Sequence, residues 1–352
     1  MFKIKNWSIR MRVTLSEVAE KAGVSVATAA KVISGNKGNI RVSEKTRERI
    51  RMVAAEMNYR PNYNAQRLAG RASRVIGILI EKNASGPLFQ MLGEIEREAA
   101  EYGYRCMIGE FKKEVRLQRE QYDIFMQHGV DGVICMPSDY LENSPEFQQE
   151  FAGVLKNTVF VDNPCLSGSA YIHVDRKTAI QNVVRHLYER GARRIAQFRG
   201  NVPYRTSIER RDGYLQAMAE LGFSGEDVFL LEMEPHFTGP EIMADAERIV
   251  REHIVPKKID AVTASNDLYA AALLNRLHAA GLRVPEDVMV VGYDNSAYTC
   301  CTQPPLTSVD DNIRQQAKAV VALLLRKLED PAVQGEYELI VPDLVIREST
   351  GK

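Results

Sequence analysis

The sequence predicts an α/β protein with an N-terminal helix-turn-helix head and a two-lobed domain, each lobe a doubly wound parallel sheet. In residues 13–60, hydrophobic positions recur at helical spacing around a glycine-containing turn. From residue 75, short apolar runs alternate with amphipathic stretches, which is typical of parallel strands covered by helices on both faces. At 352 residues the chain is too long for one core, so two or three domains are expected.

Composition narrows the class of protein. Hydrophobic residues make up 45% and charged residues 26% of the chain, as in ordinary globular proteins. No apolar run reaches the roughly 18 residues that a membrane span needs, and residues 1–7 lack the apolar core of a secretory signal. The five cysteines show no metal-ligand spacing; they are Cys106, Cys135, Cys165, Cys300 and Cys301. We expect reduced thiols in a cytoplasmic protein, without a metal or another cofactor.

The first helix of the head is marked by its start and by its apolar face. Thr14, followed three residues later by Glu17, matches a capping box. Leu15, Val18 and Ala19 lie at i, i+3 and i+4 and therefore share one face. The segment predicts a helix that packs against a neighbour through this face.

A turn and a second helix follow. Gly23 can adopt a left-handed conformation and end the first helix, and Ser25 is a good N-cap for the second. The second helix has an inner face of Ala29, Val32 and Ile33, and an outer face of Val26, Ala27, Thr28 and Lys31 near its N-terminus. A helix-turn-helix places such an outer face at base edges in the major groove of DNA. The alternative is a three-helix packing unit without a role in DNA binding.

The charge distribution favours the DNA-binding interpretation. Residues 1–74 contain 16 Lys and Arg against 5 Asp and Glu, a net charge of +11. The remaining 278 residues contain 30 and 41, a net charge of −11, so the whole chain is neutral. A basic head on an acidic body is what a phosphate-binding domain joined to a second domain should look like.

The body alternates between predicted strands and predicted helices. The apolar runs that predict strands are 75–80, 104–108, 132–136, 158–162, 194–198, 228–231, 261–264 and 288–293. The amphipathic stretches that predict helices lie near 88–102, 115–128, 176–190, 208–221, 240–253, 267–280 and 312–329. Two sets of strands imply two doubly wound lobes, and ligands bind such lobes beyond the carboxyl ends of the strands.

A polar, basic segment joins head and body. Pro61 is expected to stop the third helix of the head. Asn62 can cap a short helix over 63–69, and a helix of that length is too short to be stable alone in water. We therefore expect it to fold only on DNA, which would let it transmit the state of the body to the head.

With both parts considered, the chain resembles transcription regulators of the lactose-repressor/galactose-repressor (LacI/GalR) family over about residues 13–350. The motifs of the head that carry the resemblance are 14–19 (Thr-Leu-Ser-Glu-Val-Ala), 22–25 (Ala-Gly-Val-Ser), 42–50 (Val-Ser-Glu-Lys-Thr-Arg-Glu-Arg-Ile) and 58–62 (Asn-Tyr-Arg-Pro-Asn). Those of the body are 210–214 (Arg-Arg-Asp-Gly-Tyr), 265–267 (Ser-Asn-Asp), 283–287 (Arg-Val-Pro-Glu-Asp), 291–294 (Val-Gly-Tyr-Asp), 304–307 (Pro-Pro-Leu-Thr) and 342–350 (Pro-Asp-Leu-Val-Ile-Arg-Glu-Ser-Thr).

The resemblance implies a homodimer on an inverted-repeat operator, with recognition helices in the major groove and paired hinge helices in the minor groove. Leu68 matches the residue that wedges into the central base step, where apolar side chains kink DNA; packing against the body is the alternative. Ala65 matches the small residue that lets the hinge helices approach. The positions that match phosphate contacts are Thr14, Ser25, Thr28, Ser34, Ser43, Tyr59 and Asn62.

The head departs from the family pattern in the second helix and in the loop after it. Ala30 lacks a phosphate-contacting hydroxyl, and Lys31 replaces the usual base-reading Arg, whose planar bidentate contact Lys cannot make. Val26 and Ala27 hold the positions that vary most with operator sequence and can meet a thymine methyl. The loop 35–41 is about three residues longer than the family pattern, and it either adds phosphate contacts or is a plain insertion.

The body also resembles periplasmic sugar-binding proteins, which implies an effector between the lobes. Such clefts use a carboxylate, an Arg fork and an aromatic ring to bind a sugar. The matching positions are Arg210 and Asp267, and with weaker support Asp162, Phe89 and Phe237. A structural salt bridge is the alternative for the charged pair, and core packing for the aromatics. Sugars, sugar phosphates and nucleobases all remain open as effectors, as inducers or as corepressors.

We therefore predict an allosteric, sequence-specific DNA-binding regulator that acts as a repressor and is not an enzyme. Dinucleotide, P-loop, zinc-protease and nucleophile-elbow motifs are missing from the sequence. A nucleoid architectural protein is the alternative, and specificity of roughly 10³-fold over non-specific DNA would discriminate. The predicted domains are a disordered extension (1–12, with Met11 a candidate start), the DNA-binding head (13–60), the hinge (61–74) and the effector-binding and dimerisation domain (75–350), with lobe one at 75–173 and 302–325 and lobe two at 174–301 and 326–350.

Overall fold

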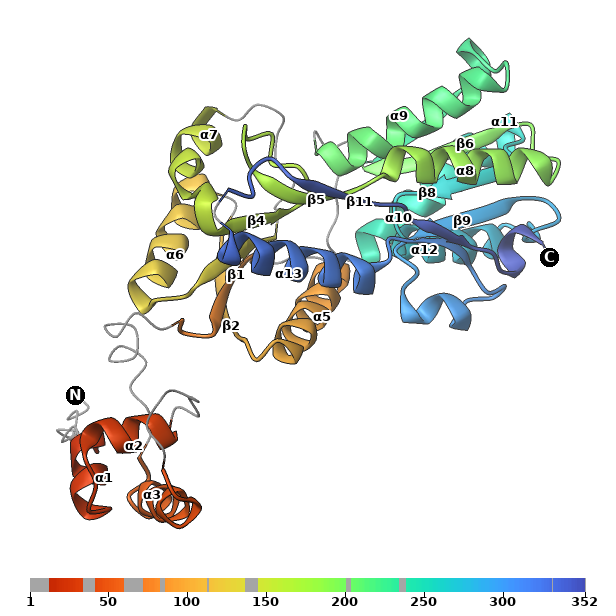
Figure 1. Cartoon of the computed structure of the whole chain (residues 1–352). Helices are drawn as coiled ribbons and strands as arrows, with labels where there is room; N and C mark the ends of the chain where they lie inside the picture. The colour runs from red at the N-terminus through yellow and green to blue at the C-terminus, as the bar shows by residue number, and fades with distance from the viewer. Residues whose placement is uncertain are drawn as a thin grey trace, which may run out of the picture. The chain divides into compact units, whose positions relative to one another are not determined.

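The computed structural model of the chain divides into two compact units, Met1–Ser73 and Arg74–Lys352 (Figure 1). The structure describes residues 13–33, 42–59, 72–82, 86–112, 114–136, 145–200, 204–233, 239–330 and 332–351. The predicted extension 1–12, the longer loop 35–41 and the hinge helix 63–69 lie outside the described residues.

The described part of the first unit contains three short helices around a small apolar core. These are α1 (Leu15–Lys21), α2 (Val26–Ile33) and α3 (Glu44–Glu56). The capping box predicted for Thr14 and Glu17 is confirmed, as is the left-handed turn at Gly23, whose φ is +64°. The fully buried residues of the core are Val18, Ala19, Ala22, Ala29, Val32, Ile50 and Val53.

The third helix ends earlier than predicted. Glu56 is its last residue, and Asn58 follows in the left-handed region with φ +50°. Asparagine tolerates this conformation, which ends helices. The prediction that Pro61 stops the helix is therefore wrong, because the chain has already turned before it.

The second unit contains two six-stranded sheets. The first has the order β11-β5-β4-β3-β1-β2, and all its neighbouring strands are parallel. Its strands are β1 (Val75–Glu81), β2 (Arg105–Phe111), β3 (Gly132–Cys135), β4 (Thr158–Val161), β5 (Ala170–Val174) and β11 (Tyr337–Ile340). The second has the order β12-β10-β9-β8-β6-β7, in which only β12 is antiparallel. Its strands are β6 (Ile195–Gly200), β7 (Phe229–Met233), β8 (Ala261–Ala264), β9 (Met289–Tyr293), β10 (Thr307–Asp310) and β12 (Asp343–Val345).

Helices cover both faces of each sheet, which confirms the doubly wound prediction. α5 (Gly86–Glu101) and α13 (Ile313–Glu329) pack on one face of the first sheet, and α6 (Val115–His128) and α7 (Pro145–Phe151) on the other. The second sheet lies between the pair α10 (Gly239–Ile249) and α12 (Asp267–Ala279) and the pair α8 (Arg176–Glu189) and α9 (Arg205–Glu220) (Figure 1). A π-helical turn (Val250–Ile254) and the short α11 (Val255–Lys257) follow α10. The 3-10 turns are Ala152–Asn157, Gly225–Asp227, Ala297–Cys301 and Glu348–Thr350. No helix in the described part of the chain is long and apolar enough to cross a membrane.

The eight predicted strands are confirmed to within a few residues, but four further strands were not predicted. β5, β10, β11 and β12 lack the continuous apolar run that marked the others. β10 reads Thr-Ser-Val-Asp, β11 is exposed over most of its length, and β12 has three residues. β11 and β12 are short edge strands, and the interior strands β5 and β10 contain polar residues such as His173, Thr307 and Ser308, so hydrophobic pattern alone did not reveal them.

The chain crosses between the two sheets three times, after β5, after β10 and after β11. β10 belongs to the second sheet, whereas the whole of α13 and β11 belongs to the first. The lobe boundaries expected at 302 and 326 are therefore displaced to about residues 311 and 341, because the unpredicted strands β10, β11 and β12 set the crossings.

Gly213 allows two helices of the second lobe to approach closely. A Cβ at this position of α9 would lie 2.4 Å from the backbone oxygen of Lys177 in α8. We expect Gly213→Ala to lower the free energy of unfolding by about 1–3 kcal/mol, the usual cost of overpacking. The matched control is Gly93→Ala in α5, where a Cβ would meet nothing within 4 Å and where alanine favours the helix. Urea unfolding measures both, and equal stability of the two variants would contradict the close approach.

Candidate functional sites in the head and in the cleft

In the head, hydroxyl side chains cap the N-termini of all three helices. Thr14 Oγ1 accepts a hydrogen bond from Glu17 N (3.3 Å), Ser25 Oγ from Thr28 N (3.2 Å) and Ser43 Oγ from Thr46 N (3.3 Å). The three caps are exposed. A helix N-terminus carries partial positive charge and free N–H groups, so these ends favour phosphate oxygens.

The outer face of α2 is open at the residues predicted to meet bases. Val26 is 46% exposed and Ala27 is also exposed, whereas Thr28 is half-buried. Lys31 is only 8% exposed, so contact with a base requires its side chain to change position. Tyr59 is half-buried and packs against the apolar core of the head. Ser34, Asn62, Ala65 and Leu68 lie outside the described residues.

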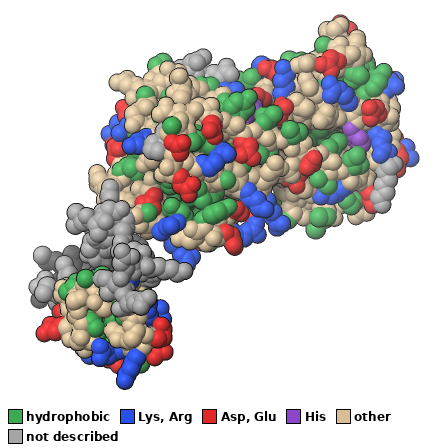
Figure 2. Space-filling model, in the orientation of Figure 1, with side chains coloured by type: hydrophobic (Ala, Val, Ile, Leu, Met, Phe, Trp, Pro, Cys, Tyr) green, Lys and Arg blue, Asp and Glu red, His purple; other side chains and the backbone are tan. Residues whose placement is uncertain are grey.

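The surface of the head carries both signs of charge. Figure 2 shows Lys and Arg side chains there next to Asp and Glu. The exposed basic residues of α3 are Lys45, Arg49 and Arg51.

In the body, two adjoining cavities lie at the carboxyl ends of strands from both sheets. Their volumes are about 460 Å³ and 290 Å³. Both are lined by Pro87, Thr206, Arg210, Asn266 and Asp294. The prediction of a cleft beyond the strand ends is confirmed.

Arg210, on α9, lies over an aromatic ring, and its Nε forms no hydrogen bond with the described residues. Its guanidinium carbon lies 3.7 Å from the centroid of the Tyr293 ring, and its Nη1 donates to the carbonyl oxygen of Ser265 (2.5 Å). Its Nε is buried without a hydrogen-bond partner in the described part of the chain. The predicted Arg therefore does line the cleft.

Asp294, directly after β9, lines both cavities and has an unusual backbone. Its φ is +105° and that of Asn295 is +46°. Such strain in residues other than glycine persists only where the surroundings hold it, often at ligand sites. The side chain reaches solvent through the cavities, yet enclosure by the protein raises the pKa of Asp294 well above its usual range; Arg210 opposes the rise, and Asp311 and Asp267 add to it.

The larger cavity contains two further buried polar atoms without hydrogen-bond partners among the described residues. They are Gln197 Oε1 and Arg199 Nε, both on β6. The other atoms of these side chains are engaged: Gln197 Nε2 donates to the Arg210 oxygen (3.1 Å) and Arg199 Nη1 to Glu232 (2.5 Å). Buried polar groups are rarely left unpaired, so these two side chains and Arg210 mark a polar wall of the cavity.

The formal charges of the lining nearly cancel. Arg199 is paired with Glu232, and Arg176 with Asp162. Arg210 and Asp294 have no ion-pair partner within 4 Å among the residues that the structure describes. Arg210 and the carboxyl groups of Asp294 and Asp311 remain, and Asp311 accepts a hydrogen bond from the Tyr293 hydroxyl (2.5 Å). A site that places a guanidinium beside carboxyl groups favours a neutral molecule with several hydroxyl groups.

Asp267, the predicted effector carboxylate, lies behind the cleft. It is fully buried and lines neither cavity. Its Oδ1 accepts from Ser308 Oγ (2.5 Å) and its Oδ2 from Ser296 N (2.7 Å). Burial raises the pKa of Asp267 in spite of these hydrogen bonds. This placement supports a structural role for Asp267, since one oxygen holds the loop after β9 and the other binds Ser308 on β10.

Asp162, after β4, lines the smaller cavity but is already paired. Arg176, the first residue of α8, donates Nη1 and Nη2 to its two oxygens at 2.9 and 2.8 Å, and His173 Nδ1 lies 3.7 Å away. Both Asp162 and Arg176 are buried. A ligand that binds Asp162 would therefore have to compete with Arg176.

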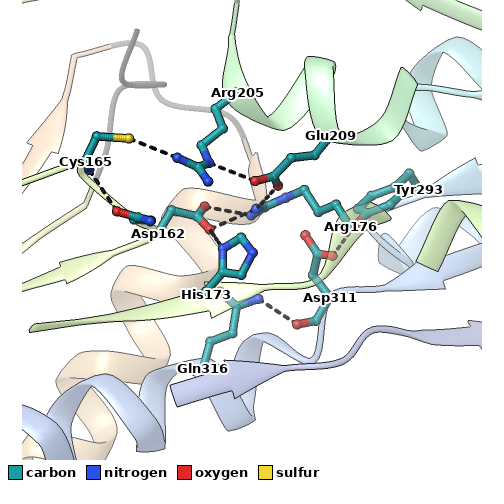
Figure 3. A network of polar contacts seen from close by, with 10 residues as sticks. Asp162, Cys165, His173, Arg176, Arg205, Glu209, Tyr293, Asp311 and Gln316 are labelled. Atoms are coloured by element: carbon teal, nitrogen blue, oxygen red, sulfur yellow. Dashed lines mark hydrogen bonds and ion pairs between the residues drawn. The ribbon is translucent and has the colours of Figure 1, made fainter. Parts of the chain in front are cut away.

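This ion pair belongs to a polar network that joins the lobes (Figure 3). Arg176 Nη1 also lies 3.5 Å from Glu209 Oε2 on α9, and Glu209 Oε1 accepts from Arg205 Nε at 2.8 Å. Arg205 Nη1 then reaches Cys165 Sγ at 3.0 Å, in the loop of the first lobe that begins at Asp162. The contacts thus run from the first lobe to α8 and α9 and back again.

Of the two predicted aromatic residues, Phe89 does not line the cleft. Phe89 is 48% exposed on α5 and lines neither cavity, although its neighbours Pro87 and Leu88 do. The helical repeat turns it to the outside. Phe237 lies outside the described residues. Among the residues that the structure describes, no group of three His, Cys, Asp or Glu side chains is placed to hold a metal ion.

Asp294, Gln197 and Arg199 were missed by the sequence analysis, although two signals were present. Asp294 follows a buried strand directly. Gln197 and Arg199 alternate with apolar residues inside the fully buried strand β6. Burial of a polar side chain costs free energy unless it forms hydrogen bonds, so polar residues in such a strand indicate a functional or structural role.

Family models match both parts of the chain. The model of bacterial regulatory proteins of the lacI family matches residues 14–62, and the periplasmic binding protein-like domain matches residues 184–350. The ribose operon repressor of Bacillus subtilis (strain 168) is 31% identical over 316 residues, which cover 89% of this chain and 90% of that protein. The HTH-type transcriptional repressor PurR of Vibrio atlanticus (strain LGP32) is 28% identical over 337 residues, covering 96% and 98%.

Solved structures agree in fold over nearly the whole chain. The lac repressor dimer bound to operator and the anti-inducer ONPF has a TM-score of 0.83 at 26% identity and covers 97% of this chain and 100% of that one. The transcriptional regulator CelR in complex with cellobiose has a TM-score of 0.66 at 26% identity and covers 96% and 100%.

Proposed function

Because the chain belongs to the lacI family of bacterial regulatory proteins, we propose that it is a dimeric, DNA-binding transcriptional repressor controlled allosterically by a small molecule in the cleft. It acts by binding, not by catalysis, and works in the cytoplasm. The observation that carries this proposal is the combination in one chain of a helix-turn-helix head with a cleft whose buried polar atoms are unpaired.

The proposed effector is a neutral carbohydrate. Arg210 and Asp294 offer one fork of donors and one pair of acceptors, and Gln197 Oε1 and Arg199 Nε extend the site. Adjacent hydroxyls of a sugar can donate to the carboxylate and accept from the guanidinium at the same time. Relatives include a ribose operon repressor and a regulator in complex with cellobiose, which supports this class of ligand.

In the head, we propose that the exposed residues of α2 read base edges while the helix caps contact phosphates. The proposed DNA-contacting residues are Thr14, Ser25, Val26, Ala27, Thr28, Lys31, Ser34, Ser43, Tyr59, Asn62, Ala65 and Leu68. Leu68 is the proposed wedge at the centre of the operator. Residues 13–60 would form the DNA-binding domain, 61–74 the hinge, and the remainder the effector-binding and dimerisation domain.

The test is selection of bound sequences from random duplex DNA at one fixed salt concentration. We expect one inverted repeat, bound at least roughly 10³-fold more tightly than unrelated DNA. Recovery of no consensus, both alone and in the presence of a metabolite extract, would overturn the proposal. A mass near that of a monomer on the recovered site would contradict the dimer.

A substitution of one base-reading residue should change the operator sequence that the protein selects, while the protein remains folded and binds DNA. We expect Val26→Gln to alter the preferred base at one position of each half-site, because Gln can pair with adenine while Val can only meet a methyl group. Discrimination there should change by about 1–3 kcal/mol. The matched control is Met52→Gln on α3, which is 62% exposed and should leave the consensus unchanged. An unaltered consensus for Val26→Gln would remove Val26 from the interface.

A further inference from the structure

The C-terminal segment 347–350 binds two neighbouring strands of the second sheet, β9 and β10, through its side chains. Ser349 Oγ donates to Val290 O (2.6 Å) and accepts from Thr307 N (2.8 Å). Thr350 Oγ1 lies 2.9 Å from Thr307 Oγ1. Val290 and Thr307 lie near the starts of β9 and β10, so these contacts fix the segment at the amino-terminal ends of the two strands.

Arg347 extends this attachment to the loop itself. Its Nη1 donates to Leu306 O (2.7 Å), and its Nη2 donates to Asn295 Oδ1 (2.7 Å). Asn295 is otherwise held by two partners, since its N donates to Ser308 Oγ (3.0 Å) and its Nδ2 to Asp310 Oδ2 (2.8 Å). Every hydrogen-bonding group of the Asn295 side chain is therefore engaged.

The loop needs this support, because Asp294 and Asn295 both have positive φ. Two successive residues in that region cost free energy and return to ordinary conformations unless neighbours prevent it. Ser296, the next residue, is held from the other side by Asp267. The loop is thus clamped by Arg347 at Asn295 and by Asp267 at Ser296.

We propose that Arg347 is a positioning residue for effector recognition: through Asn295 it holds the strained backbone that presents the Asp294 carboxylate to the cleft. The inference rests on the proposed function, in which Asp294 contacts the effector. It assigns a role to the terminal motif 342–350, which neither the head nor the cleft explained. The guanidinium suits this task, because its rigid fork can bind a carbonyl and an amide oxygen at once.

The experiment uses the full-length protein without DNA or sugar, labelled with ¹³C at the aspartate carboxyls. The titration of Asp294, assigned by its loss in Asp294→Asn, is compared in the wild type and in Arg347→Met. The charged groups that face Asp294 are Arg210 on α9, Arg176 on α8, Asp311 before α13 and Asp267 on α12. All of them are retained in the variant.

We expect the measured pKa of Asp294 to fall in Arg347→Met by one pH unit or more, toward the ~3.9 of a free aspartate, because a released loop exposes the carboxyl to water. The sign is informative: loss of a nearby cation by itself would raise this pKa. Asn295→Gly, which keeps the positive φ, should give the same fall, and the double variant should add nothing to it. Arg347→Lys should restore part of the wild-type value.

Ser349→Ala is the matched control in the same segment. It removes the hydrogen bonds to Val290 and Thr307 and leaves Arg347 and Asn295 unchanged. We expect it to lower the melting temperature without moving the pKa of Asp294. An unchanged pKa in Arg347→Met, or an equal shift in Ser349→Ala, would overturn the positioning role. Failure of the cleft to bind any sugar would overturn the proposed function and leave this result intact.

Discussion

Replacement of Asp294 by asparagine is expected to raise the melting temperature of the ligand-free protein and to abolish its response to effector. The enclosed carboxyl has a raised pKa, so its ionised form is unfavourable in the folded state. Asparagine removes that charge, tolerates positive φ and keeps one acceptor. Arg210 retains the Tyr293 ring and the Ser265 carbonyl as neighbours.

The sign of the stability change depends on pH. A folded-state pKa above the unfolded value of ~3.9 means that the folded protein holds its proton more tightly between those two values. The wild type therefore loses stability as pH rises through this window, and Asp294→Asn does not. At pH 7 we expect a gain of about 1 kcal/mol, which is roughly 2 °C in melting temperature, and the gain should vanish near pH 4.

Effector binding should change in the opposite direction. Loss of a charge-assisted pair of hydrogen bonds costs about 2–3 kcal/mol, which is ~30-fold or more in affinity. Displacement from the selected operator measures the response, with D-ribose and cellobiose as the first sugars tested. Asp227→Asn, at an exposed carboxylate of the turn Gly225–Asp227, is the control and should leave both properties unchanged. A variant that is less stable and still responds would contradict the role of Asp294.

Replacement of Asp162 by alanine should have the largest effect on stability. It would leave Arg176 buried with Glu209 3.5 Å away as its nearest remaining carboxylate. Breaking one side of a buried ion pair typically costs about 3–5 kcal/mol, and the proximity of Glu209 should bring the cost to the lower end. Chemical denaturation of the ligand-free protein measures it.

The double variant Asp162→Ala with Arg176→Met separates the charge from the packing. Because it leaves no uncompensated ion, we expect it to recover most of the lost stability. If the double variant were as unstable as Asp162→Ala alone, the pair would stabilise the fold through its packing volume and not through its charges.

The same pair predicts a pH dependence. Burial would raise the pKa of Asp162, but Arg176 and His173 hold it well below its usual range. A lowered folded-state pKa contributes stability that is present above the unfolded value of ~3.9 and is lost as pH falls below it. The wild type should therefore lose stability below about pH 4 more steeply than the double variant.

The sequence was sufficient to predict those elements that depend on interactions within one turn or one strand. The capping box of Thr14 and the turn at Gly23 depend on neighbours a few residues away. Strands such as 132–135 (Gly-Val-Ile-Cys) are fully buried and are apolar throughout. β10, in contrast, buries Thr307 and Ser308, whose hydroxyls are satisfied by Arg347, Thr350 and Asp267. Nothing near them in sequence indicates those partners.

The candidate site shows the same limit. The resemblance placed Arg210 in the cleft correctly; it lies in the second turn of α9, the helix that follows β6. Asp267 and Asp294 both follow buried strands, and only distant partners distinguish them. Ser308, more than 40 residues from Asp267, turns that carboxylate inward, whereas the positive φ of Asp294 turns the other toward the cavities.

The last strands of the chain have a consequence for its synthesis. Each sheet of the body has its edge closed by a strand from residues 337–345: β11 pairs with β5, and β12 with β10. A ribosome must therefore translate past residue 345 before either sheet is complete, whereas the helices α1, α2 and α3 share a core of their own and can fold early.

A polypeptide cut short before residue 337 would combine a finished head with two sheets whose edges, β5 and β10, are open. Open edges recruit other chains and favour aggregation. Late nonsense mutations should therefore remove the protein from the cell, and should not leave a truncated form that occupies operators permanently.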